Sequence, residues 1–136
     1  MEVEMELYTS YFAKVKQLKE MGYDNLVCVA GYAPKFYFDT PKARFYPDLA
    51  PRREWWKEWQ LKFKDNPNSP ESQAWYEQKY QETVLDKLDP QTVLKELGDK
   101  AVMLCYEKPG DFCHRQLIAW WLSENTGVDV WEVKFN

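Results

Sequence analysis

The run Ala101–Tyr106 (Ala-Val-Met-Leu-Cys-Tyr) constrains the fold of this chain more than any other segment. A continuous apolar run of this kind is typical of a strand that is buried on both faces, as the strands of parallel sheets are. A turn with Pro109-Gly110 follows, and then a helix is expected over about 112–125, with Asp111 as its N-cap. A buried strand that leads directly into a helix predicts an α/β protein.

Three further segments have the character of strands. Residues 3–8 alternate apolar and acidic side chains, residues 25–30 form a short apolar run, and residues 128–135 alternate again. We therefore predict one domain over residues 1–136. It is a three-layer α/β fold with a mostly parallel sheet of about four strands and helices on both faces.

Residues 31–100 are predicted to be a helical, aromatic-rich insertion between the second and third strands. Its first part, residues 31–50, is rich in proline and aromatic residues and looks irregular, and a loop of this length is more often functional than a plain connection. Three helices are expected after it, from Pro51 to about Phe63, from Pro70 to about Leu88, and from Pro90 to near Gly98. Four aromatic side chains of the first helix share one face: Trp55, Trp56, Trp59 and Phe63.

Charge is distributed unevenly along the chain. The formal net charge is −4, which argues against a protein that coats nucleic acid with a uniformly basic surface. Residues 31–62 are the exception, with seven Lys or Arg against four Asp or Glu. Basic and aromatic residues alternate over 32–59. This pattern suits either stacking on nucleic-acid bases beside neutralised phosphates or a lid that covers the sheet.

The cysteines and the N-terminal segment indicate the compartment. Cys28, Cys105 and Cys113 do not have the spacing of a secreted disulfide framework. The first ten residues are acidic, and no apolar run approaches the roughly 20 residues of a membrane span. We therefore expect a cytoplasmic protein with reduced thiols and no membrane partner.

Neither a metal nor a cofactor is predicted. The single histidine and the three cysteines lack the paired spacing of structural zinc sites. A metal site built from Cys105, Cys113 and His114 is the alternative that this spacing argument disfavours.

The turn 107–115 is the predicted functional site. Ligands of open parallel sheets bind at the carboxyl ends of the strands, and Thr9 and Ser10 are expected at the same edge, where they can also cap a helix over about 11–21. The helix that begins in the turn offers free N–H groups and the positive end of its dipole to an anion. Arg115 adds a guanidinium that can bind phosphate or carboxylate with two hydrogen bonds.

Three other side chains of the turn are candidates for chemistry. His114 falls on the buried face of the helix, and it is either a core residue or a neutral imidazole that acts as a base or hydrogen-bond donor, because the helix N-terminus disfavours its protonation. Cys113 is either a small hydrophobic residue or a nucleophile whose thiolate the helix favours. Glu107 can move protons, or it can simply pair with Arg115.

The same segment resembles a known family. Its strand, its Cys-x-Glu, its short turn and its Cys-His-Arg at the start of a helix are similar to the C-terminal signature of the domain of unknown function 488 family. Three stretches carry the resemblance: Leu104–Arg115, Leu7–Ser10 with Phe12, and Leu49–Pro51. The resemblance spans nearly the whole chain and implies a compact α/β cytoplasmic protein of bacteria, archaea or phages. It implies no particular activity.

One position departs from the family pattern. Many members have Asp-x-Arg after the second strand, whereas this chain has Val29-Ala30-Gly31-Tyr32. A second basic ligand beside Arg115 would then come from Lys35 or Arg44.

These observations support two main hypotheses. In the first, the chain is an enzyme for a phosphate-bearing ligand such as a nucleotide or a nucleic acid. Arg115 and the amides of 112–114 would hold the anion, His114 or Glu107 would move protons, and Cys113 would shape the site or attack. In the second, it is a non-catalytic nucleic-acid or protein-binding module that uses residues 32–59. A small interaction protein, in which the turn has only structural roles, is a third hypothesis.

Overall fold

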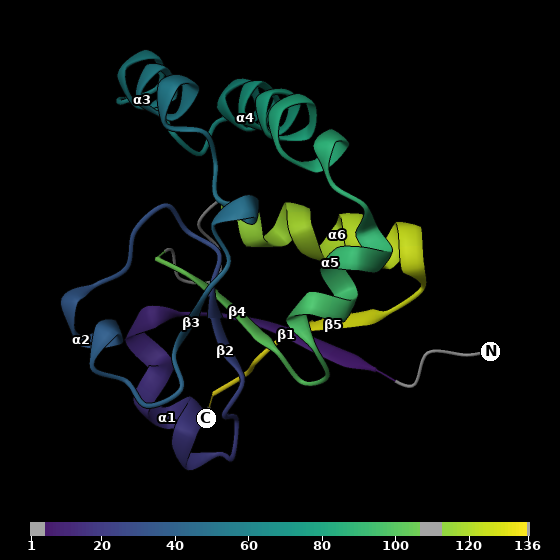
Figure 1. Ribbon diagram of the computed structural model, residues 1–136. Coiled ribbons are helices and arrows are strands. Elements are labelled where there is room, and N and C mark those ends of the chain that lie inside the picture. Colours follow the sequence, from purple (N-terminus) through teal and green to yellow (C-terminus); the bar gives the residue numbers. More distant parts are fainter. Residues whose placement is uncertain (1–4, 107–112, 136) are drawn as a thin grey trace.

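The centre of the molecule is a five-stranded sheet in which all neighbouring strands are parallel (Figure 1). The computed structural model describes residues 5–106 and 113–135. The strands follow the order β3-β2-β4-β1-β5 across the sheet. Their bounds are Glu6–Tyr11 (β1), Leu26–Cys28 (β2), Arg44–Phe45 (β3), Val102–Cys105 (β4) and Asp129–Glu132 (β5). The predicted α/β class with a parallel sheet is confirmed.

The strand β4 holds the middle of the sheet, as its apolar sequence requires. All four of its residues are buried, and it pairs with β1 on one side and β2 on the other. The register places Cys105 opposite Tyr11 of β1 and Leu104 opposite Cys28 of β2. Because the strands are parallel, their carboxyl ends meet at one edge of the sheet.

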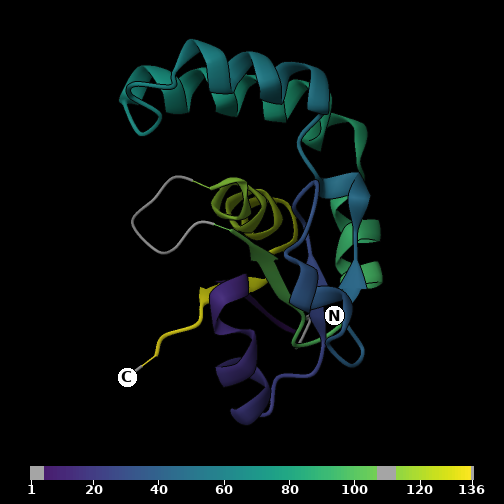
Figure 2. The same cartoon turned by 90° about the vertical axis from the view of Figure 1, so that its left-hand side faces the viewer.

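The two faces of the sheet carry separate hydrophobic cores. On one face, Phe12, Val15 and Leu18 from the short helix η1 (Phe12–Lys14) and from α1 (Val15–Glu20) pack with Leu104 and with Tyr37 of α2 (Lys35–Phe38). Side chains alternate along a strand, so the neighbouring residues face the other way. Figure 2 shows α1 on this face and α3 to α6 on the opposite one.

The opposite face is covered by two layers of helix rather than one (Figure 2). The inner layer contains α5 (Pro90–Leu97) and α6 (His114–Thr126). The outer layer is the pair of α3 (Arg53–Lys62) and α4 (Pro70–Thr83), which lie side by side. Two short 3-10 turns, η2 (Pro47–Leu49) and η3 (Leu85–Lys87), flank this pair. The larger core joins both layers to the sheet.

Indole hydrogen bonds fasten α3 to α4. The Nε1–H of Trp55 donates to Oγ1 of Thr83 at 2.8 Å, and that of Trp59 donates to Oγ of Ser72 at 2.9 Å. The ring of Tyr76 on α4 meets both indoles edge to face. The aromatic side of the helix that the sequence predicted therefore faces α4. No helix in the described part of the chain is both long and apolar enough to span a membrane.

Several boundaries differ from the sequence prediction. The strand β1 continues to Tyr11, so Thr9 and Ser10 lie inside it and do not cap a helix. The stretch that looked irregular contains α2 and the two-residue strand β3, which raises the number of strands among residues 5–106 and 113–135 to five. The N-cap of α6 is Cys113, and Asp111, the residue expected there, lies outside the described residues. Gly127 ends α6 in the left-handed conformation, with φ of 78°, which a side chain would disfavour.

Candidate functional site

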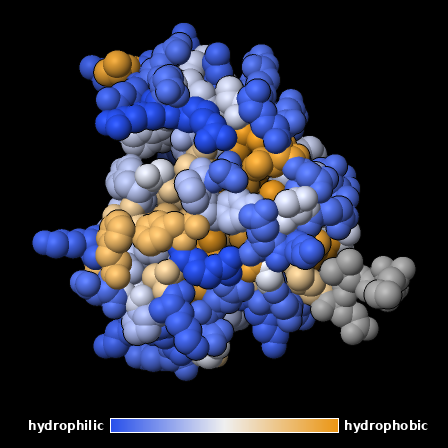
Figure 3. Space-filling model, viewed as in Figure 1, coloured by the Kyte–Doolittle hydropathy of each residue, from blue (hydrophilic) through white to orange (hydrophobic). Residues whose placement is uncertain are grey.

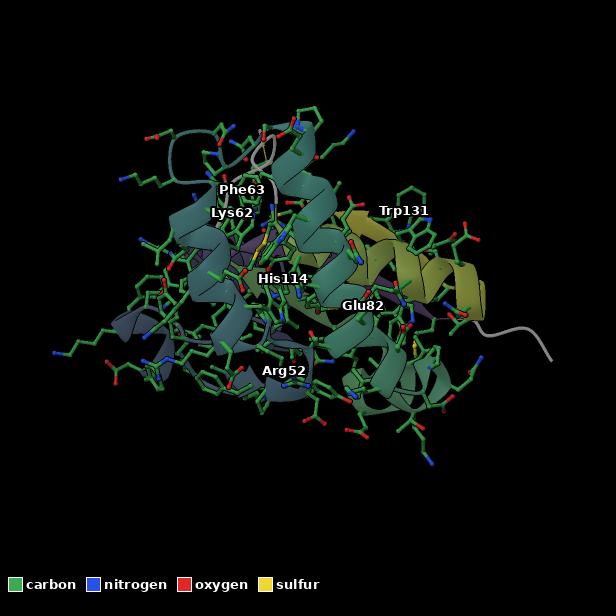
Figure 4. All side chains as sticks on the ribbon, turned by 90° about the horizontal axis from the view of Figure 1, so that it is seen from above. Arg52, Lys62, Phe63, Glu82, His114 and Trp131 are labelled. Atoms are coloured by element: carbon green, nitrogen blue, oxygen red, sulfur yellow. A yellow bond between two sulfur atoms is a disulfide. The ribbon has the colours of Figure 1, made fainter. Side chains whose placement is uncertain are left out.

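A cavity of about 560 Å³ opens at the carboxyl edge of β2 and β4. The start of α6 forms its floor, and α3 and α4 form its roof. Figure 4 looks down through this roof and shows His114 between the two helices, beside a disulfide. The described lining residues are Ala30, Gly31, Tyr32, Ala50, Pro51, Arg53, Trp56, Lys57, Trp59, Tyr76, Cys105, Tyr106, Cys113 and His114. Segments from five parts of the chain therefore meet here.

Two sulfur atoms form part of the floor. Cys105 at the end of β4 and Cys113 at the N-cap of α6 are joined in a disulfide, and Cys28 is free and buried. The expectation that all thiols are reduced is therefore wrong for this pair. Its two residues stand at the end of a strand and the start of the next helix, with a sequence separation of 8. In this state Cys113 carries no thiol for nucleophilic attack.

His114 is fixed by one short hydrogen bond. Its Nε2 lies 2.6 Å from the carbonyl oxygen of Val29, just beyond β2, and a carbonyl can only accept. Nε2 therefore carries the proton, which leaves Nδ1 as the unprotonated nitrogen of the neutral ring. Nδ1 lies 3.8 Å from Sγ of Cys113. The imidazole thus faces the disulfide with its lone pair.

Burial keeps the imidazole neutral. The side chain is 5% exposed, and removal of water lowers the pKa of His114 to about 4; the hydrogen bond to Val29 opposes this shift, and the charge of Arg115 adds to it. The sequence predicts a neutral ring because of the helix N-terminus, whereas the largest cause in the structure is desolvation by burial. The ring also packs against Tyr80 of α4, with 5.5 Å between the centroids. The hydroxyl of Tyr80 donates to the carbonyl of Leu49 at 2.5 Å, which connects the roof to the chain ahead of α3.

Aromatic rings make up much of the remaining wall. Tyr32 follows β2 and Tyr106 follows β4, and their centroids are 5.0 Å apart. Trp56 of α3 meets Tyr32 edge to face at 6.2 Å. Tyr32 is 59% exposed and Tyr106 is 40% exposed, so both rings are partly open to solvent at the mouth of the cavity.

The described lining is basic. It contains Arg53 and Lys57 and no acidic residue. Both are on α3, four residues apart, and so share one side of the helix with Trp56 between them. In the sequence both residues belong to the basic stretch 31–62, and neither was predicted as a site residue. The spacing Arg-x-x-Trp-Lys on a helix that faces the strand ends is the signal that could have identified them.

Arg115 is buried and lies beside the sheet, not in the lining of the cavity. It is completely shielded from solvent, and its Nε and Nη2 donate to the two carboxylate oxygens of Glu132 on β5 at 3.1 and 3.2 Å. Its Nη1 lies 2.8 Å from Sγ of Cys105, and its guanidinium lies over the ring of Tyr11. Oγ1 of Thr9 also donates to Glu132, at 2.6 Å. Among the described residues, Glu132 is thus a carboxylate partner of Arg115 that the sequence did not predict.

The other predicted binding residues are dispersed. Ser10 is fully buried, faces away from the lining, and its hydroxyl has no hydrogen-bond partner among the described residues. Lys35 is exposed on α2. The guanidinium of Arg44 donates to the carbonyls of Leu97 and Glu96, which lie near the amino end of β4. The structure thus brings Cys113 and His114 together in the cavity, and Glu107 lies outside the described residues.

The fold and the cavity define a parallel α/β protein with a pocket at the carboxyl edge of its sheet, where the loops of this class carry binding sites. A family model described as the Active DUF488-N3 subclade matches residues 11–126. The chain belongs to this branch of the DUF488 family, as the resemblance of the turn 104–115 predicted. No curated protein and no solved structure matches the chain.

The buried imidazole makes a prediction about acid stability. The pKa of His114 is about 4 in the folded chain and about 6.5 when exposed, so the unfolded chain binds more protons between these values. Its contribution is complete above pH 6.5 and is lost as the pH falls towards 4. The free energy of unfolding should decrease by on the order of 3 kcal/mol across this window because of His114 alone. Urea titrations at several pH values measure this change.

His114→Gln is the matched control for this titration. Its amide can still donate to Val29 but does not titrate. The difference in unfolding free energy between the wild type and the variant should therefore shrink from pH 7 to pH 4. A difference that is constant with pH would show that His114 is not a buried neutral base.

Proposed function

We propose that this protein is an enzyme that binds a nucleotide-like ligand in the cavity between the sheet edge and the α3/α4 pair. The observation that supports this most directly is the composition of the described lining, which combines Arg53 and Lys57 with partly exposed aromatic rings and a neutral His114. Cationic side chains suit a phosphate group, and aromatic rings suit a planar base. The description of the family model as active agrees with catalysis.

The size of the cavity agrees with a small-molecule ligand. A volume of about 560 Å³ is within the range of roughly 300–1,000 Å³ that such sites occupy. In our proposal the base packs against the exposed rings of Tyr32 and Tyr106 at the mouth of the cavity, and the phosphate reaches Arg53 and Lys57. This assigns the phosphate to the roof of the cavity. Arg115, which the sequence suggested for this role, instead supports the floor through Glu132 and Cys105.

His114 is our candidate for proton transfer. Its Nε2 is committed to Val29, so Nδ1 is the atom that can accept a proton near neutral pH. A group with its pKa near 4 is a weak base in the empty site, and an anionic ligand nearby would raise that pKa. Glu107, from the same turn, is a second candidate for this role. Cys113 shapes the floor as a disulfide and can attack only when it is reduced.

Measurements of ligand affinity test whether Arg53 and Lys57 in the roof of the cavity bind the phosphate. Adenosine 5′-monophosphate should quench tryptophan fluorescence by contact with Trp56, and the double substitution Arg53→Gln/Lys57→Gln should weaken its binding by at least tenfold, since each lost charge-assisted hydrogen bond is worth roughly 1.5–3 kcal/mol. Adenosine, which has no phosphate, should bind the wild type and the double variant equally. Fluorescence titrations of both ligands measure these affinities.

A charge-matched variant makes the result specific. Lys62→Gln/Lys64→Gln removes two positive charges, one from the last residue of α3 and one two residues after it, and neither residue is in the described lining of the cavity. This variant should bind adenosine monophosphate as the wild type does. Equal weakening by both double variants would indicate only a general effect of charge, and the roof would then have no specific role.

Catalysis is tested separately from binding. His114→Gln should retain the affinity for the nucleotide that the wild type converts, while the rate of conversion falls by about 100-fold or more, the usual contribution of a general acid or base. Anion-exchange chromatography of the four ribonucleoside monophosphates after incubation with each protein measures the rates. No conversion of any of them by the wild type, in reduced and oxidised form, would contradict an enzyme for this class.

A second function is favoured by one specific observation. Exposed phenylalanines gather over α2 and β3, where Figure 3 shows a hydrophobic patch, and Lys35 is exposed among them. Phe36, Phe38 and Phe45 are 51%, 66% and 45% exposed. Aromatic rings beside a lysine are typical of surfaces that stack single-stranded nucleic acid.

This alternative makes an opposite prediction. If the chain is a nucleic-acid-binding module, Phe38→Ala/Phe45→Ala should weaken the binding of a fluorescent oligothymidylate by about tenfold or more, at roughly 1–3 kcal/mol for each lost stacking contact. Arg53→Gln/Lys57→Gln should leave that binding unchanged. Fluorescence anisotropy at fixed salt measures it, and the absence of oligothymidylate binding by the wild type rules this module out.

A further inference from the structure

We propose that Cys105 and Cys113 form a thiol–disulfide exchange site, which small thiols and disulfides reach through the cavity. Both residues line the cavity, and they are joined in a disulfide there. This inference does not depend on the nucleotide proposal, because it concerns the floor of the cavity and not the ligand that the roof binds.

The third cysteine serves as an internal comparison. Cys28 faces the other core, where burial raises the pKa of its thiol, and its Sγ donates to the carbonyl of Ala30 at 3.6 Å. It has no sulfur partner and does not line the cavity. A thiol in such surroundings is unreactive. The chain thus contains one inert cysteine and one pair with access to the cavity.

Arg115 makes the two sulfur atoms of the pair chemically different. The guanidinium is completely buried and held by two hydrogen bonds to Glu132, and it directs Nη1 at Sγ of Cys105 over 2.8 Å. A cation at this distance stabilises a thiolate. Cys105 is therefore the better leaving group of the two, because a thiol of lower pKa leaves faster in exchange. This buried contact is the observation on which the proposal depends most.

His114 gives the other sulfur a different partner. Nδ1 of the neutral ring is 3.8 Å from Sγ of Cys113 and carries no proton. In the reduced protein it can accept a hydrogen bond from the Cys113 thiol, and it provides no positive charge to stabilise a thiolate. The two sulfurs are thus unlike, with a cation beside one and a neutral acceptor beside the other.

The exchange proceeds in two balanced steps. The thiolate of a small thiol attacks Sγ of Cys113, a new sulfur–sulfur bond forms, and the bond to Cys105 breaks with its electron pair on the Cys105 thiolate beside Arg115. A second thiolate then attacks the sulfur of the first small molecule, and Cys113 leaves and takes a proton from water. Two electrons pass from two small thiols to the protein, and the small molecules leave as their disulfide. In the reverse direction, a small disulfide oxidises the pair.

The test uses the full chain with Cys28→Ala, so that only the pair can react. The protein is equilibrated with mixtures of reduced and oxidised glutathione, blocked with N-ethylmaleimide and weighed by mass spectrometry. We expect a reversible conversion from a form with no maleimide to a form with two. At intermediate ratios, fragmentation of the peptide that carries both cysteines should place glutathione on Cys113 and maleimide on Cys105.

Three outcomes would overturn the proposal. The first is two maleimides on the protein after equilibration with oxidised glutathione. The second is a disulfide that excess dithiothreitol does not reduce in the folded chain. The third is glutathione on Cys105 with maleimide on Cys113. All three would be measured on a chain that retains Arg115, so none of them depends on whether an Arg115 variant folds.

A pair of variants tests the positioning of Arg115. Arg115→Met removes the cation and should slow the reduction by dithiothreitol by roughly tenfold, the size of a lost charge-assisted bond to a thiolate. Glu132→Gln keeps the cation and loosens its support, so its effect should be smaller. Equal rates in both variants and the wild type would remove Arg115 from the mechanism. Nucleotide affinity is measured on the same proteins, so failure of either proposal is recognised separately.

Discussion

The hydrogen bond between Nε2 of His114 and the carbonyl oxygen of Val29 determines the geometry of the cavity floor. It joins the first turn of α6 to the end of β2, two segments that are 85 residues apart. The same bond selects the tautomer, and burial under Tyr80 keeps the ring neutral. Cys113, the N-cap of α6, directly precedes His114 in the chain, so the same hydrogen bond also restricts where Cys113 lies.

The roof depends on a second set of contacts that the floor does not share. Trp55 and Trp59 donate to α4, and the hydroxyl of Tyr80 holds the connection at Leu49. These bonds use the polar atoms of the aromatic residues and leave their ring faces for packing. A chain with many aromatic residues can thus place a second helical layer over α6 and still keep a cavity. The reason is that α3 is hydrogen-bonded to α4 and is not packed onto the strand ends.

The sequence predicted those features that depend on interactions between residues close together in the chain. The apolar run of β4, the starts of α4 and α5 at Pro70 and Pro90, and the inward direction of His114 all follow from the identity of neighbouring residues. Contacts between side chains of different elements do not follow from the identity of neighbouring residues. Glu132 lies 17 residues after Arg115 on an edge strand, and no periodicity in the sequence connects the two. The strand β3 was missed for a similar reason, since two residues carry no alternation to detect.

The position of the charges shows why a signature motif and a binding surface need not coincide. Arg115 belongs to the segment that resembles the family signature, yet its guanidinium supports Cys105 and Glu132 from within the protein. The cations of the cavity come from α3, inside the insertion. A buried guanidinium between a carboxylate and a sulfur is held without rotamer freedom, which suits the stabilisation of a charge that appears at a fixed atom. Exposed cations on a helix suit a ligand that arrives from solvent. The floor and the roof of this cavity are therefore built from separate parts of the chain, and each carries its own charged groups.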